Sequence, residues 1–280
     1  MAMLFRVAAV SFLNTRPLIH GLGDDASQVA LTRALPSRLA GLLEAGEADV
    51  ALLPVIETFR GRSGGILPGT GIACRGEVGS VKLFGVTPLD EVETILADRG
   101  SRASVALAEV LLRESTGGAP VFRETEPRPG QLPGEGEALL VIGDRCFEYE
   151  RELRKMEQPG VWSRDLGQWW TEMTGLPFVF AVWAVASDFD PTRAADLARI
   201  LTAARDRGLT SLDELAAEAA AEGRLGHGGE ATAAAIVYYF RHNLLYRLGD
   251  EEELGMRRFH ELCLRHGVIP EGSFPAVVRG

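Results

Sequence analysis

Residues 49–57 of this chain, DVALLPVIE, constrain the fold more than any other segment of the sequence. The segment is apolar without a break from Val50 to Leu53, which is typical of a strand buried on both faces of a parallel sheet. Helices cover both faces of such a sheet, so the run predicts an α/β fold. Pro54 ends the strand at its carboxyl end, the edge at which open α/β sheets bind ligands. Pro54 is therefore a candidate ligand-binding residue.

The rest of the chain divides into two stretches of expected strands and helices. In the first stretch, strands are expected at residues 6–10, 30–35, 66–74 and 80–86, with a helix from Pro36 to Gly46. From Val92 onward, strands are expected at 94–97 and 138–142, and helices at 102–116 and 165–174. Apolar residues 178–185 then form one long strand. Helices follow Asp190, including residues 231–246 and 251–266.

This order predicts two lobes with a ligand cleft between them. Residues 1–91 and 185–280 form the first lobe, which the chain enters twice and which carries the C-terminal helices. Residues 92–184 form the second, inserted α/β lobe. Strand ends and helix starts from both lobes are then expected to line the cleft.

The net charge of -10 limits the partners of the chain. Nucleic acid needs a basic face, so we do not expect it as a partner. A small anion is compatible with this charge where a local cluster of amides and arginines holds it. No apolar window is long enough to span a membrane, and the first residues lack the pattern of a signal peptide. We expect a cytoplasmic protein without a membrane partner.

The three cysteines, Cys74, Cys146 and Cys263, lie far apart in the sequence. No Cys-x-x-Cys pair occurs and no histidine has metal-ligand spacing, so neither a metal site nor a disulfide framework is expected. The sequence also has no phosphate loop, glycine-rich dinucleotide turn or nucleophile elbow. No cofactor is expected.

Small polar residues follow the first expected strand directly, at the point where a ligand cleft would open. Ser11, Asn14, Thr15 and Arg16 precede Pro17, which is typical of the first turn of a helix. Because these residues lie beyond the carboxyl end of a strand, we expect them to face a ligand. The alternative is that Asn14 and Thr15 only cap the helix that follows.

A second polar segment begins the strand expected at residues 80–86. Ser80 follows a glycine-rich turn and offers a hydroxyl, and Val81 beside it offers a backbone amide. Both are candidate ligand-binding groups.

The third polar segment, RGSRAS at residues 99–104, opens a helix. Gly100, Ser101, Arg102 and Ser104 combine free amides, two hydroxyls and an arginine at a helix start, where the helix dipole favours a carboxylate or phosphate. The alternative is that Ser101 and Ser104 only cap the helix.

Two carboxylates lie near the expected cleft. Asp144 follows the strand at residues 138–142, and Glu57 follows Pro54. Either is a candidate base, and Asp144 is also a candidate substrate-binding residue. Strand-end aspartates commonly make turn hydrogen bonds instead, so a structural role for Asp144 stays open.

Five segments together resemble one enzyme family, the chorismate dehydratases of the futalosine route to menaquinone. The segments are SFLNTRPL at 11–18, DVALLPV at 49–55, RGEVGSV at 75–81, DRGSR at 98–102 and LPFVFAVW at 176–183. They occur in the family's order and span about two thirds of the chain, which makes the set more specific than any one segment. The resemblance implies the two-lobed, type II periplasmic-binding-protein-like fold.

The resemblance also implies a hydro-lyase reaction, in which chorismate loses water to give 3-[(1-carboxyvinyl)oxy]benzoate. Asn14, with Ser11 beside it, is then the expected catalytic group at the departing hydroxyl. Ser101 and Arg102 are expected at one substrate carboxylate, and Ser80 with the Val81 amide at the other. With no strong base in these segments, the enolpyruvyl carboxylate of the substrate is expected to take the proton.

Three alternatives remain open. The sister enzyme that releases dihydroxynaphthoate shares the fold, but it usually opens with a Ser-Pro-Cys-Pro-Asn-Asp segment that is absent here. A non-catalytic binding protein for a small carboxylate would use the same fold, and fold alone does not decide between catalyst and binder. A ligand-sensing module would need a DNA-binding domain for which the chain has no room. The sequence also leaves a homodimer open.

Overall fold

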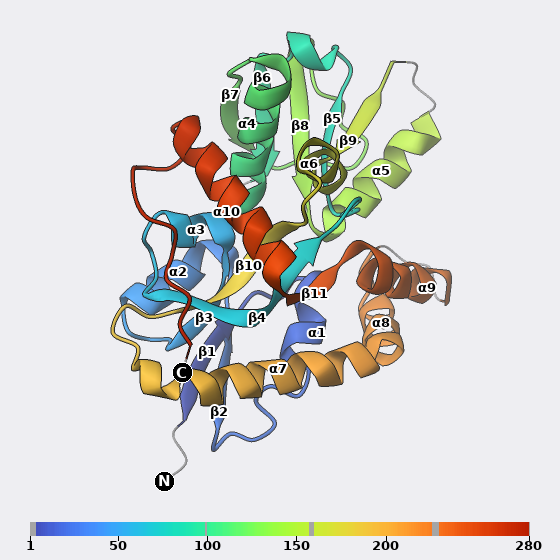
Figure 1. Cartoon of the computed structure of the whole chain (residues 1–280). Helices are drawn as coiled ribbons and strands as arrows, with labels where there is room; N and C mark the ends of the chain where they lie inside the picture. The colour runs from blue at the N-terminus through green and yellow to red at the C-terminus, as the bar shows by residue number, and fades with distance from the viewer. Residues whose placement is uncertain (1–3, 99, 157–159, 226–229, 280) are drawn as a thin grey trace.

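The computed structural model describes residues 4–98, 100–156, 160–225 and 230–279 and shows two α/β lobes, one above the other in Figure 1. The α/β fold class is therefore confirmed. Each lobe is built on one mixed sheet. Among the described residues, no helix is both long enough and apolar enough to cross a membrane.

The first sheet has six strands in the order β11-β4-β10-β3-β1-β2. These strands are β1 (Phe5–Ala9), β2 (Val29–Arg33), β3 (Val50–Pro54), β4 (Gly65–Cys74), β10 (Phe178–Val185) and β11 (Leu245–Leu248). β1 pairs in parallel with β2 and β3, whereas β10 runs antiparallel to both β3 and β4. The apolar run that begins at Val50 is the buried strand β3, as expected.

The second sheet has five strands in the order β7-β6-β8-β5-β9. They are β5 (Val81–Gly85), β6 (Thr94–Asp98), β7 (Val121–Thr125), β8 (Glu137–Ile142) and β9 (Trp162–Asp165). β6 pairs in parallel with β7 and β8, and β5 runs antiparallel between β8 and β9.

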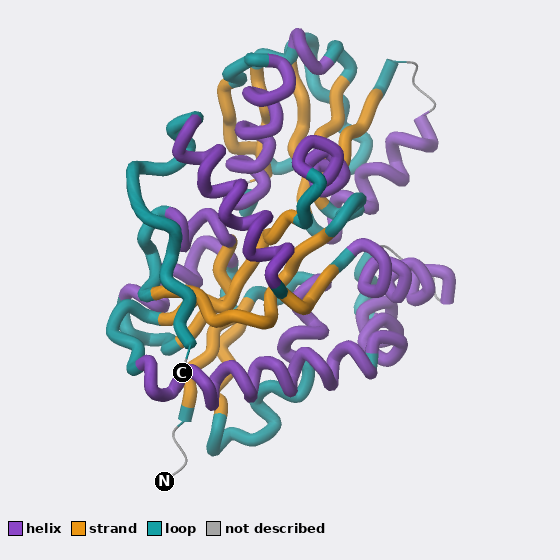
Figure 2. Tube along the Cα trace, viewed as in Figure 1, coloured by secondary structure: helices purple, strands orange, loops and turns teal. Residues whose placement is uncertain are grey.

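Helices lie around the central strands of each lobe (Figure 2). They are α1 (Arg16–Ile19), α2 (Pro36–Glu44), α3 (Val55–Phe59), α4 (Arg102–Thr116), α5 (Asp144–Met156), α6 (Leu166–Thr174), α7 (Ala194–Thr210), α8 (Leu212–Ala221), α9 (Glu230–Tyr238) and α10 (Asp250–Arg265). Short helical turns are η1 (Leu13–Thr15), η2 (Leu89–Glu91), η3 (Pro191–Arg193) and the π-helical η4 (Tyr239–Asn243). α10 packs on β10 and β11 of the first sheet and on α4 of the second lobe.

The chain crosses from one sheet to the other at different residues from those that the sequence predicts. β5, assigned from the sequence to the first lobe, pairs with β8 and β9 of the second sheet. β10, assigned to the second lobe, lies between β3 and β4 of the first sheet. The chain therefore crosses between the sheets at residues 75–80 and 166–177, not at Val92 and Val185. Strand partners depend on contacts far apart in the sequence, which local apolar patterns do not report.

The expected helix at residues 231–246 is only partly present. α9 ends at Tyr238, the π-helical turn η4 follows, and the chain then extends as β11. β11 pairs antiparallel with β4 and forms the edge of the first sheet, so tertiary pairing overrides the local helical pattern. β7, β9 and α5 are also elements that the sequence analysis did not predict.

The two crossings between the lobes are held together by Asp165. Its carboxylate accepts hydrogen bonds from the backbone N–H groups of Val78 at 3.0 Å and Gly79 at 2.8 Å, and from Gln168 N–H at 3.0 Å at the start of α6. Burial raises the pKa of Asp165, while these three N–H donors lower it. Asp165 thus fixes the turn before β5 against the helix that leads into β10.

Candidate functional site

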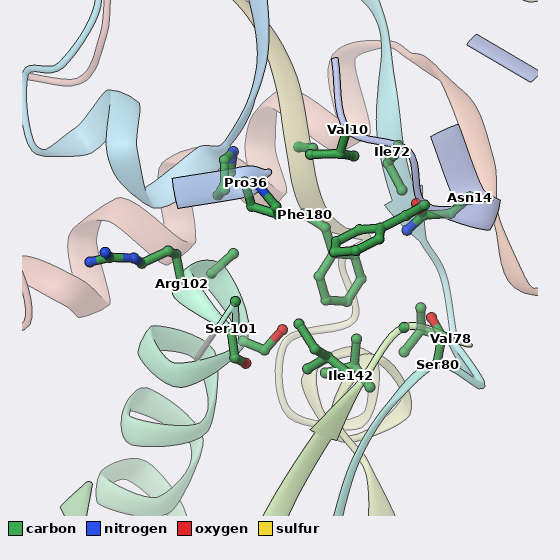
Figure 3. Close-up of a pocket in the computed structure, with 18 of the residues that line it drawn as sticks. Val10, Asn14, Pro36, Ile72, Val78, Ser80, Ser101, Arg102, Ile142 and Phe180 are labelled. Carbon is green, nitrogen blue, oxygen red and sulfur yellow. The ribbon is translucent and has the colours of Figure 1, made fainter. Parts of the chain in front are cut away.

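A cavity lies between the two sheets, and its walls come from both lobes (Figure 3). Its empty space is about 720 Å³ when the open mouth is counted. The residues that line it are Val10, Phe12, Asn14, Pro36, Leu52, Pro54, Ile72, Val78, Ser80, Val81, Gly100, Ser101, Arg102, Ala103, Ser104, Ile142, Gly143, Phe180, Ala181 and Leu244. Most of these side chains are apolar, so the few polar groups stand out.

The segment after β1 divides between the cavity and its surroundings. Asn14 lines the cavity, as expected. Thr15 does not, because it is fully buried, and its hydroxyl donates to the Asn14 Oδ1 at 3.4 Å. Thr15 therefore supports the side chain of Asn14 and does not meet a ligand in this cavity. Neither residue caps a helix with its side chain.

Ser11 and Arg16, both expected at the ligand, line a neighbouring cavity instead. Arg16 forms an ion pair with Glu222, which directs its guanidinium away from the main cavity. The physical reason is the η1 turn, which rotates successive side chains to different sides of the chain. Phe12 lines both cavities and so separates them.

Ser80 and Val81 both line the main cavity, at the beginning of β5. The Ser80 carbonyl accepts the Gly143 N–H at 2.8 Å, which fixes the Ser80 backbone against the end of β8. Only 2% of Ser80 is exposed. Its hydroxyl oxygen also lies 2.8 Å from the buried Tyr239 hydroxyl.

All four residues expected at the start of α4, Gly100, Ser101, Arg102 and Ser104, line the cavity. Ser101 stands at the N-cap position but its side chain makes no cap hydrogen bond. Its hydroxyl is buried and, among the described residues, has no partner. An unpartnered buried hydroxyl at a helix start is a donor that a bound anion would satisfy. Arg99, which the sequence places in the same segment, lies outside the described residues.

The backbone at the start of α4 adds further donors. The Arg102 N–H donates to the Gly100 carbonyl at 3.1 Å, so it is not free for a ligand. Within the described part of the chain, the N–H groups of Ala103 and Ser104 have no acceptor, as expected in the first turn of a helix. In Figure 3 the Arg102 side chain extends sideways, away from Asn14 and Ser80.

Pro54 lines the cavity at the end of β3, as expected, and Phe180 opposite it was not predicted. β10 carries a bulge at Phe180, because Val179 pairs with Ala73 and Ala181 with the adjacent Ile72. A bulge adds one residue and redirects its side chain. Figure 3 shows the Phe180 ring in the middle of the cavity. The sequence shows Phe180 only as part of an apolar strand, which does not reveal a bulge.

Asp144 lies beside the cavity but does not line it, whereas its neighbour Gly143 does. The Asp144 carboxylate pairs with Arg224 at 2.8 Å and accepts the backbone N–H of Leu13. Burial raises the pKa of Asp144, although Arg224 acts in the opposite direction. These contacts therefore support a structural role for Asp144, which was one of the two alternatives from the sequence. Glu57 is likewise paired, with Arg60 and Arg62, each at 2.9 Å.

The chemistry of the site follows from its lining. Among the described lining residues there is no Asp, Glu, His, Cys or Lys, so this cavity offers hydroxyls, an amide, backbone N–H groups and, at its side, Arg102. No group of three or more potential metal ligands occurs among the residues the structure describes. Such a set can bind a small anion with an apolar body, and it contains no strong side-chain base.

Comparisons with known proteins agree with this geometry. Residues 5–265 match the model of a family described as menaquinone biosynthesis. A chorismate dehydratase of Thermus thermophilus is 33% identical over 263 residues, which covers 89% of this chain and 92% of that protein.

Solved structures share the fold at low sequence identity. A protein of Archaeoglobus fulgidus superposes with a TM-score of 0.68 at 13% identity, covering 95% of this chain and 98% of its own. The periplasmic aliphatic sulphonate binding protein of Escherichia coli superposes with a TM-score of 0.64 at 13% identity, covering 100% and 95%. The periplasmic-binding-protein-like fold is therefore confirmed. Because the family model matches most of its length, the chain belongs to the menaquinone biosynthesis family, and within that family it is similar to a chorismate dehydratase.

Proposed function

We propose that this protein is a chorismate dehydratase and that it acts as a hydro-lyase. Chorismate loses its ring hydroxyl and the proton of the neighbouring ring carbon, which gives 3-[(1-carboxyvinyl)oxy]benzoate and water. The observation that carries the proposal is the buried Ser101 hydroxyl, which has no partner among the described residues and shares one largely apolar cavity with Ser80 and Asn14. The similar enzyme of Thermus thermophilus carries the same name.

The cavity suits a substrate with two carboxylates and an apolar ring. One carboxylate binds at the start of α4, where the Ser101 hydroxyl and the first-turn N–H groups of Ala103 and Ser104 favour negative charge. The other binds at Ser80 at the start of β5. The ring lies against apolar side chains such as Phe180.

The reaction asks little acid–base chemistry of the protein. Loss of water makes the ring aromatic, so the substrate itself supplies the driving force. The protein aligns the breaking C–O and C–H bonds and stabilises the charge that develops. The Asn14 amide donates to the departing hydroxyl, and the enolpyruvyl carboxylate of the substrate takes the ring proton, because no side-chain base is found among the described lining residues. The proton then joins the departing hydroxide, so that water leaves and the carboxylate is regenerated.

The test is to incubate purified protein with chorismate and to follow the products by chromatography with ultraviolet detection. A new aromatic product with the mass of chorismate minus water is expected, and a protein with Asn14→Ala serves as the control. Unchanged chorismate that nevertheless binds would favour the non-catalytic binding protein. Chorismate that neither binds nor reacts would favour the dihydroxynaphthoate-forming relative.

Three expectations of the sequence analysis stay predictions: the cytoplasmic location, the absence of nucleic acid and membrane partners, and a homodimer. The negative charge of the chain supports the expectation that nucleic acid is not a partner.

A further inference from the structure

Behind the cavity wall, the hydroxyl of Tyr239 lies 2.8 Å from the hydroxyl of Ser80. Tyr239, unlike Ser80, does not line the cavity, so it does not meet a ligand there. We propose that Tyr239 is a positioning residue, which donates to the Ser80 oxygen so that the Ser80 proton points into the cavity toward a bound carboxylate. The inference rests on the proposed function, in which Ser80 binds one substrate carboxylate.

The direction of the hydrogen bond follows from the chemistry of the two groups. A serine hydroxyl has one proton and can accept as well as donate. Burial raises the pKa of Tyr239, so the phenol stays neutral and keeps a proton to donate. When Tyr239 donates, the Ser80 proton is free for an anion, and the two bonds in series polarise each other.

The surroundings of Tyr239 hold its ring in place. The ring packs edge-on against Phe147 of α5, with centroids 5.1 Å apart and an interplanar angle of 78°. Tyr239 is also the first residue of the π-helical turn η4, and such turns often occur at functional sites. At the end of that turn, the Asn243 side chain donates to the Glu77 carbonyl at 2.8 Å. The turn that bears Tyr239 is thus fixed to the loop just before Ser80.

A neighbouring tyrosine provides a matched control. Tyr246 on β11 is also buried, at 3% exposed, but among the described residues its hydroxyl has no hydrogen-bond partner. Tyr246→Phe therefore removes a buried hydroxyl without removing a hydrogen bond. Tyr239→Phe removes a hydroxyl of the same kind together with its bond to Ser80.

The test combines single and double variants. We expect Tyr239→Phe to raise KM for chorismate about tenfold with kcat within about threefold, because Ser80 binds the carboxylate in the ground state and in the transition state alike. Ser80→Ala is expected to cost more, and the Tyr239→Phe/Ser80→Ala double variant about as much as Ser80→Ala alone, since Tyr239 acts only through Ser80. Tyr246→Phe should stay within about twofold of wild type.

The same series is measured for binding of 3-(carboxymethoxy)benzoate, an inert aromatic dicarboxylate, by isothermal titration calorimetry. Wild-type protein that binds this probe but does not convert chorismate refutes the proposed function, while the dissociation constants of the variants still decide the role of Tyr239. Wild-type protein that neither binds nor converts refutes both. Equal effects of Tyr239→Phe and Tyr246→Phe, or independent effects of Tyr239→Phe and Ser80→Ala in the double variant, refute the role of Tyr239.

Discussion

The Asp144 carboxylate lies 2.8 Å from the Arg224 guanidinium, which ties the first residue of α5 in the second lobe to the segment after α8 in the first. Arg224 also donates to the Ser11 carbonyl at 3.3 Å. In Figure 1, α5 lies beside α8 and α9 at this side of the molecule. The pair therefore bridges the two lobes next to the cavity.

Replacement of Asp144 should change how stability depends on pH. Burial raises the folded-state pKa of Asp144 above its ordinary value, so the folded protein takes up this proton more readily than the unfolded chain. The stabilising contribution is thus complete below the unfolded pKa and is lost as the pH rises through the folded pKa. The free energy of unfolding of wild type minus that of Asp144→Asn should shrink in urea titrations as the pH rises through the ordinary carboxyl range and above it.

Asp49 provides the control of opposite sign. Burial acts to raise its pKa, but hydrogen bonds and charge from Arg6 outweigh burial and lower it. The contribution of Asp49 is present above its unfolded pKa and is lost as the pH falls through the folded pKa. For Asp49→Asn the same difference should therefore grow as the pH rises. If the two free-energy differences changed with pH in the same direction, the raised pKa of Asp144 would be contradicted.

Asn14→Ala should abolish most turnover and leave the fold intact. The variant removes the amide that we assign to the departing hydroxyl, and loss of one such donor costs about a hundredfold in kcat. Steady-state rates measure the loss of turnover, and circular dichroism checks that the fold is intact. Ser11→Ala is the comparison, because Ser11 lines the neighbouring cavity and its variant should retain wild-type kcat. Wild-type rates in Asn14→Ala would remove Asn14 from the mechanism.

Ser101→Ala should weaken substrate binding without lowering the stability of the ligand-free protein. The Ser101 hydroxyl is buried and, among the described residues, unpartnered, so its removal breaks no hydrogen bond before the ligand arrives. We expect KM to rise about tenfold, which corresponds to about 1.4 kcal/mol of binding free energy. Thermal unfolding and steady-state kinetics measure both effects.

Ser115→Ala is the comparison, at an exposed serine whose hydroxyl does have a hydrogen-bond partner. The Ser115 hydroxyl accepts from the Trp169 indole at 3.2 Å, away from the cavity. This variant should lower thermal stability and leave KM unchanged. A fall in stability for Ser101→Ala equal to that for Ser115→Ala would show that Ser101 has a structural partner.

Gly167→Ala should destabilise the junction of the two lobes. A Cβ atom at Gly167 would lie 2.5 Å from the Cys74 sulfur and 2.8 Å from the Gly76 carbonyl oxygen, so α6 would have to move away from the turn before β5. Overpacking of this kind costs about 1–3 kcal/mol in free energy of unfolding. Gly41→Ala in α2 is the control: a Cβ there meets no atom within 4 Å, and the variant should gain about 0.5–1 kcal/mol. Denaturant unfolding of both variants measures the difference.

The sequence by itself determined the elements whose signals are local. The apolar run of β3 ended by Pro54, the start of α4 at Ser101 and the polar residues Asn14 and Ser80 are readable because burial pattern and helix starts depend on near neighbours. These local signals were sufficient to predict an α/β fold with a cleft and most of the polar lining of the cavity.

Tertiary structure alone decided which strands are partners and where side chains point. β5 joins the second sheet and β11 replaces the end of an expected helix, because each pairs with strands distant in sequence. The bulge aims Phe180 into the cavity, η1 turns Arg16 out of it, and a residue more than 150 positions away, Tyr239, reaches Ser80. Such outcomes arise from non-local pairing and packing, whose free energies a short window of sequence does not contain.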